Sequence, residues 1–181
     1  PPTIDAHPNV VISVATSFIR GGYTFDELVA GWRARGATLG IRDYHDVFTW
    51  NHDLPRKSRG GNANYLAREI PEFHEKGARF MNSENGDSWG ANGLGFWLTP
   101  RLLWDIDQAS RIDELIKDFL VNAFGLASGP MRGFYHLLCR DESVRSNEDV
   151  VARMYRSLDE ARRAARLPAV HRRLDDLILY T

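Results

Sequence analysis

ARFMNSENGDSWGANGLGFWLTPRLLWD, residues 78–105, is the stretch around which the rest of this chain is organised. It begins with a short apolar run, residues 78–81, that has the length and bulk of a buried strand. A polar turn follows, and a second apolar run, residues 94–104, is long enough for a helix. A strand that ends in carboxylate, amide and aromatic side chains before a helix is typical of the catalytic edge of a βα-barrel. The alternative is a polar loop that caps the next helix, with Glu84 and Asp87 merely solvated.

The composition describes a chain with ample material for a hydrophobic core. Its 181 residues are 43% hydrophobic and 11% aromatic, which suits one large domain or one domain with a helical annex. Lys and Arg total 23 against 24 Asp and Glu, and this balance argues against the basic stripe of a nucleic-acid-binding protein. No apolar run approaches the length that spans a bilayer. We therefore expect neither nucleic acid nor a membrane span.

The cysteines and histidines limit which metal sites the chain can form. Cys139 is the only cysteine, which excludes an internal disulfide and a thiolate metal cluster, and its helical context predicts a small buried hydrophobe. The six histidines show no paired ligand spacing such as H-E-x-x-H. We predict no metal site and no cofactor.

Three apolar runs are predicted to be strands of one parallel sheet. Residues 10–15, VVISVA, form a run rich in β-branched residues, typical of a strand that is buried on both faces. Residues 37–42 and 78–82 are the second and third predicted strands. All three should be mutually parallel, because each is followed by a helical pattern and successive βα units form right-handed crossovers.

Two helices are predicted between these strands and on one side of them. The first covers residues 24–35 and begins with a capping box formed by Thr24 and Glu27. The second covers residues 62–76 and is expected in two pieces, because Pro71 removes a backbone donor from the helix interior.

Residues 1–106 are therefore predicted to be an α/β unit, and residues 107–181 an α-helical region that contributes packing. Three βα units do not close a barrel of eight strands. The chain is then either a small open α/β layer or the carboxyl-terminal part of a (β/α)8 (TIM) barrel. In the second case its first strand should have an unpaired edge, and the missing amino-terminal barrel units would be its partner.

Two predicted strand ends carry a carboxylate, Asp43 after the second strand and Glu84 after the third. Neighbouring parallel strands end side by side, so these two groups are expected to face one cleft. Glycoside hydrolysis requires such a pair, one carboxyl group protonated and the other ionised. At each position the alternative is structural, with Asp43 pairing with Arg42 or capping a turn.

The side chains around these carboxylates suit a sugar-binding cleft. A flat aromatic ring can cover the C–H face of a pyranose, while amide, imidazole and guanidinium groups bind hydroxyls or a substrate carboxylate. The predicted substrate-binding residues are Arg42, Tyr44, His45, Trp50, Asn82, Asn85 and Trp89.

The succession ENGDSWGANGLGFW, then RLLWD, then DF with NAFGLA and later FY, resembles an uncharacterised bacterial family. Its members carry a domain of unknown function in the neighbourhood of α-glucuronidases and β-hexosaminidases, on a TIM-barrel scaffold. The resemblance covers essentially the whole chain. It implies the last three βα units of a carbohydrate-active barrel, with Glu84 in the cleft and Asp43 placed by analogy. It also implies a periplasmic or extracellular location.

The sequence thus predicts a glycoside-hydrolase-like protein that acts on a poly- or oligosaccharide through paired carboxylates, present here as a fragment. The alternative is a non-catalytic carbohydrate-binding or structural module on the same fold. A hydrolase requires the carboxyl groups of Asp43 and Glu84 to converge within roughly 5–10 Å, whereas a binding module needs only aromatic and amide groups along a groove.

Overall fold

The computed structural model describes residues 2–47, 54–139 and 147–181, and within these ranges it is an α/β protein. Three strands form one sheet in the order β1 (Val11–Ala15), β2 (Thr38–Tyr44), β3 (Ala78–Glu84). Both strand pairs are parallel, which confirms the predicted parallel sheet. Both later strands extend two residues past their predicted ends, from 42 to 44 and from 82 to 84, so Asp43 and Glu84 belong to the strands themselves.

Helices α1 (Phe25–Ala34) and α2 (Ala63–Glu75) cover one face of the sheet. The α1 helix begins with the predicted capping box, in which the Thr24 hydroxyl accepts from the backbone N–H of Glu27 and the Glu27 carboxylate accepts from that of Thr24. Phe25 packs against the buried residues of β1 and β2 and also contacts Phe73 of α2 edge-on, with ring centroids 5.8 Å apart. The two helices therefore share one side of the sheet.

The α2 helix is continuous through Pro71, so the prediction of two helical pieces is wrong. A proline in a helix interior costs about 3 kcal/mol, because it removes a hydrogen bond and crowds the preceding turn. Leu66, Ile70 and Phe73 are buried on both sides of Pro71. Burying three large apolar side chains contributes about 1.5–3 kcal/mol each, which offsets that cost.

Beyond the sheet the chain is helical. Helix α3 (Trp89–Trp104) begins at Trp89 rather than at the predicted position 94, with Ser88 as its cap. The helices that follow are η2 (Ile106–Arg111), α4 (Ile112–Phe124), η3 (Gly125–Ala127), α5 (Ser128–Leu138), α6 (Glu148–Ala164) and α7 (Pro168–Tyr180). Along the described ranges, none of the helices combines the length and apolar character that a bilayer crossing needs.

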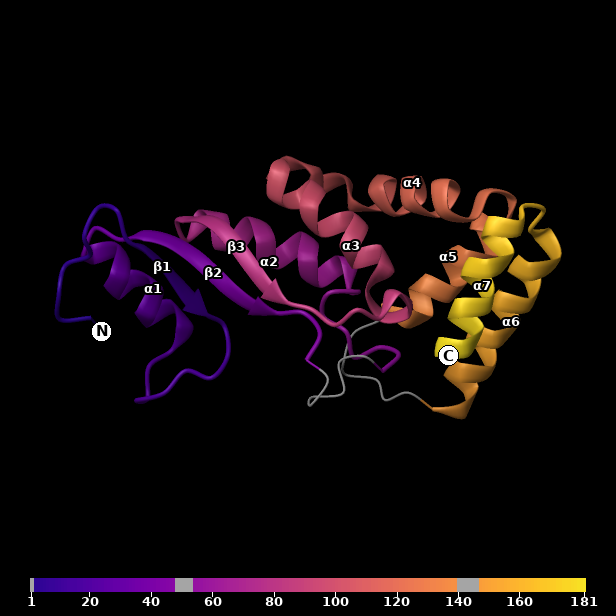
Figure 1. Cartoon of the computed structure of the whole chain (residues 1–181), viewed down its shortest axis with the longest axis horizontal. Helices are drawn as coiled ribbons and strands as arrows, with labels where there is room; N and C mark the ends of the chain where they lie inside the picture. The colour runs from indigo at the N-terminus through magenta and orange to yellow at the C-terminus, as the bar shows by residue number, and fades with distance from the viewer. Residues whose placement is uncertain (1, 48–53, 140–146) are drawn as a thin grey trace.

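The largest hydrophobic cluster joins α2 and α3 to the helices from α4 to α7. It includes Leu66 and Leu98 on one side of the predicted boundary at 106/107 and Phe124, Met154 and Leu174 on the other, so both regions share one core. The sheet has smaller clusters of its own with α1 and α2. Figure 1 shows the sheet at one end of an elongated molecule and α5, α6 and α7 at the other.

Candidate functional site

The strand register decides which side chains share a face at the carboxyl end of the sheet. Arg42 is paired with Asn82, and Tyr44 with Glu84. Since side chains alternate along a strand, these four lie on the face opposite α1 and α2, which we call the open face. Arg42, Asn82 and Glu84 are partly or fully exposed there, and so is Val11 of β1.

The open face holds an ion pair beside two aromatic rings. The Arg42 guanidinium lies 2.8 Å from a Glu84 carboxylate oxygen and also 5.4 Å from the centre of the Tyr44 ring. Tyr44 in turn contacts Phe18 edge-on, with ring centroids 5.2 Å apart. This arrangement presents a cation, a carboxylate and an aromatic surface within one small area.

Phe18 is a part of this surface that the sequence analysis missed. It follows the end of β1, its side chain is 65% exposed, and its φ angle is +62°. A left-handed backbone is costly for a bulky residue other than glycine, and such positions gather at ligand sites. The signal was available, because Phe18 follows a predicted strand end as Asp43 and Glu84 do.

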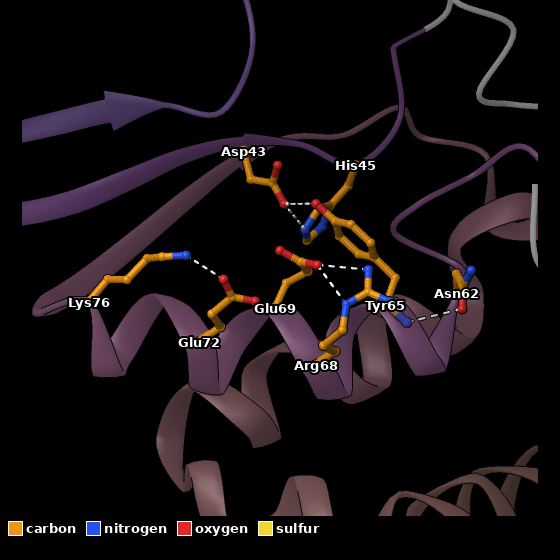
Figure 2. A network of polar contacts seen from close by, with 8 residues as sticks. All are labelled: Asp43, His45, Asn62, Tyr65, Arg68, Glu69, Glu72 and Lys76. Atoms are coloured by element: carbon orange, nitrogen blue, oxygen red, sulfur yellow. Dashed lines mark hydrogen bonds and ion pairs between the residues drawn. The ribbon is translucent and has the colours of Figure 1, made fainter. Parts of the chain in front are cut away.

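Asp43 lies on the other face of the sheet, beneath α2, and its side chain is fully buried. Its two carboxylate oxygens accept hydrogen bonds from the Thr16 hydroxyl at 2.8 Å and from the Tyr65 hydroxyl at 3.0 Å. Nε2 of His45, itself buried, lies 3.1 Å from the same oxygen that Tyr65 contacts. Figure 2 shows Asp43 and His45 reaching from the end of β2 toward Tyr65 on α2. We call Thr16, Asp43, His45 and Tyr65 the Asp43 cluster.

The partners of Asp43 stabilise its ionised form. Burial alone would raise the pKa of this carboxyl group, but His45, the Thr16 hydroxyl and the Tyr44 backbone N–H together lower it to about 2. Burial and the Asp43 charge raise the pKa of the Tyr65 phenol, which therefore remains a hydrogen-bond donor at neutral pH.

This lowered pKa predicts an acid-sensitive fold. The Asp43 carboxyl has a pKa of about 2 in the folded protein against 3.8 in an unfolded chain, so its stabilisation is complete above pH 4 and is lost as the pH falls toward 2. We expect a loss of about 2 kcal/mol over this interval. Urea unfolding of the native chain and of Asp43→Asn, measured between pH 2 and 6, checks this. The difference between their stabilities should shrink as the pH falls, and a constant difference would contradict the expectation.

The predicted convergence of Asp43 and Glu84 is not formed. Asp43 is opposite Ser83 in the register and Glu84 is opposite Tyr44, so their side chains leave the sheet from opposite faces. Asp43 is wholly buried, whereas the Glu84 side chain is 46% exposed. The sequence pattern predicts that both residues follow their strands, but both lie within the strands, and side-chain alternation therefore separates them.

A second series of buried hydrogen bonds holds the loop before α2 against α3. Asn92 donates to the Asp46 carboxylate at 2.5 Å and accepts from the Ser58 hydroxyl at 2.5 Å. Ser58 accepts in turn from the backbone N–H of Gly61. Asn92 was not among the predicted site residues, although it lies in the stretch that opens the sequence analysis. It fixes the loop that borders His45.

The remaining predicted substrate-binding residues are dispersed. His45 belongs to the buried Asp43 cluster, and Trp89 packs against the helical core, with its ring centre 6.3 Å from that of Phe124. Asn85 is exposed and donates to the Ser83 hydroxyl at 2.7 Å. Trp50 lies outside the described residues. The structure thus brings together Arg42, Tyr44, Asn82 and Glu84 from the predicted set.

Comparisons of this chain with protein-family models, with curated proteins and with solved structures found no match. Within the described ranges, no group of three or more His, Cys, Asp or Glu side chains is arranged to hold a metal ion. The candidate functional features of the described residues are therefore the open face and the Asp43 cluster.

Proposed function

We propose that this chain binds a carbohydrate on the open face, at the carboxyl ends of β2 and β3. The observation that carries the proposal is the Arg42–Glu84 ion pair beside the rings of Tyr44 and Phe18. Sugar sites combine an exposed aromatic surface with a few convergent polar groups. Phe18 offers the exposed ring, while Arg42, Asn82 and Glu84 offer donors and acceptors for hydroxyl groups.

In this proposal Asp43 does not touch the sugar. Its carboxylate orients Thr16 at the end of β1, His45 after β2 and Tyr65 on α2, so it fixes the edge from which the open face projects. Asp43 is therefore a positioning residue. The non-catalytic alternative from the sequence analysis agrees better with this geometry than the paired-carboxylate mechanism does.

Hydrolysis is the second candidate function, and the open edges of the sheet favour it. In the described sheet β1 and β3 are both edge strands, and a groove of about 400 Å³ runs beside β3 between Phe80, Leu103 and Ile106. Further βα units on these edges would extend the sheet toward the barrel that the resemblance implies. Such units would have to supply the second carboxylate, with Glu84 as the first.

Sugar binding on the open face is tested with N-acetylchitotriose and a glucuronate-bearing xylo-oligosaccharide as probes. We expect the double variant R42Q/E84Q to weaken binding about tenfold or more, since it removes the charged groups. Phe18→Ala should weaken binding about fivefold through loss of the ring contact. Isothermal titration calorimetry measures both effects.

The matched control for these variants is Phe96→Ala, which removes a 43% exposed ring from α3, an element that contributes no residue to the open face. It should leave sugar binding unchanged. If neither probe binds the native chain, or if Phe96→Ala weakens binding as much as Phe18→Ala does, the open face is not a sugar site. For the hydrolytic candidate, sugar release by a polypeptide with additional βα units should fall by orders of magnitude in Glu84→Gln.

A further inference from the structure

A second concave site lies between the helices, apart from the open face. It is a pocket of about 680 Å³ bounded by the start of α2, by α3 and α4, and by one side of α5. We call it the helical pocket. Ala63, Leu94 and Ile116 line its apolar walls, and Gly129 and Gly133 leave room beside α5. Its volume falls within the range that small-molecule sites occupy.

One of the residues that line this pocket is a buried tyrosine, Tyr135, whose hydroxyl is unpartnered among the described residues. Tyr135 is 3% exposed, and its hydroxyl has no hydrogen-bond partner within the described part of the chain. Cys139, the residue that follows α5, also lines the pocket, and its thiol donates to the carbonyl of Gly61. Burial raises the pKa of Tyr135 well above its usual value, so the hydroxyl keeps its proton. A buried donor of this kind is stabilised by an acceptor that a ligand brings.

The charged residues around the pocket favour an anionic group. Arg132 and His136 lie one turn apart on α5 and line the pocket, and both are exposed. Asp113 on α4 is the acidic residue of the lining, and within the described ranges no ion pair joins it to Arg132. Arg132 is therefore available to a carboxylate, for which its planar guanidinium is well suited.

We propose that the helical pocket binds a small apolar carboxylate, whose apolar body lies against Leu94 and Ile116 and whose oxygens accept from the Tyr135 hydroxyl and from Arg132. The two donors lie on the same helix, three residues apart, so a single ligand can reach both. The proposal is independent of sugar binding, because the pocket shares no residue with the open face.

The probe is 4-phenylbutyrate. Its affinity is compared with that of its neutral amide by NMR titration of the ¹⁵N-labelled full chain. We expect the acid to bind about tenfold more tightly than the amide, and Arg132→Gln to remove this preference. Tyr135→Phe should weaken binding of the acid about fivefold. The control Arg156→Gln removes an exposed arginine from α6, outside the pocket, and should leave the affinity unchanged.

Gly129→Leu provides an independent test of the location. Gly129 lines the pocket, and a Cβ atom there meets nothing within 4 Å, so the backbone accepts a side chain at this position. This variant should fold normally and lose binding of 4-phenylbutyrate. The proposal is overturned if the native chain does not bind the acid at millimolar concentration, if the amide binds equally well, or if Gly129→Leu folds and binds as the native chain does.

Discussion

Asp43→Ala should lower the free energy of unfolding by about 3–5 kcal/mol, because it removes the partner that three side chains of a buried polar cluster share. The Asp43 carboxylate is fully buried and contacts the Thr16 hydroxyl, the Tyr65 hydroxyl and Nε2 of His45. Its removal leaves these groups without the carboxylate that they share. Chemical denaturation at pH 7 measures the loss.

Two further variants distinguish the stability lost with the Asp43 cluster from the stability lost whenever a carboxylate is removed. Glu84→Ala removes a carboxylate of similar chemistry from the exposed pair with Arg42, and it should cost no more than about 1 kcal/mol. Tyr65→Phe removes one donor and leaves the carboxylate with the others, so a loss of about 1 kcal/mol is expected. If Asp43→Ala and Glu84→Ala destabilise the protein equally, the cluster is not a principal determinant of stability.

The strands and their direction could be predicted from the sequence because each apolar run is short, β-branched or bulky, and followed by a helical pattern. All three predicted strands are present and mutually parallel, and the Thr24–Glu27 capping box forms. These features depend on neighbouring residues and on the period of the hydrophobic pattern. Local sequence specifies such features well.

Side-chain direction at the strand ends could not be predicted in the same way. The one-residue shift in the pairing register of β2 and β3 at Leu39/Gly40 decides which face Glu84 occupies relative to Asp43. Both strands extend further than the apolar runs, and the polar residues Asp43 and Glu84 are their continuation rather than their loops. The paired-carboxylate interpretation depended on that boundary, which the apolar pattern does not define.

Tryptophan positions show a similar limit. Helical spacing with Leu94 and Leu103 predicts Trp97 and Trp104 as core residues. Trp97 does pack against the helical core, whereas Trp104 is 91% exposed at the end of α3. The hydrophobic pattern predicts which face of α3 is buried, but it does not predict how much of the length of α3 is covered by neighbouring helices. That length is set by tertiary contacts of α3 with α2, α4 and α7.

Residues 78–105 are decisive for packing, and Gly95→Ala should show this with a large loss of stability. A Cβ atom at Gly95 would lie 1.6 Å from the carbonyl oxygen of Gly60, a backbone atom that cannot move aside alone. Gly60 donates to the carbonyl of His45, so displacing it pulls on the end of β2. Forcing an extra carbon into such a contact costs about 3 kcal/mol or more.

Gly129→Ala is the matched control, because it adds the same methyl group to a helix at a position where nothing lies within 4 Å. Alanine favours a helix over glycine by up to about 1 kcal/mol, so this variant should be as stable as the native chain or slightly more stable. For a chain of this length, the loss in Gly95→Ala should lower the melting temperature by about 10 °C. Equal melting temperatures for the two variants would show that α3 and the loop before α2 can separate freely. In that case the close approach of Gly60 to Gly95 would not hold the edge on which Glu84 and the Asp43 cluster lie.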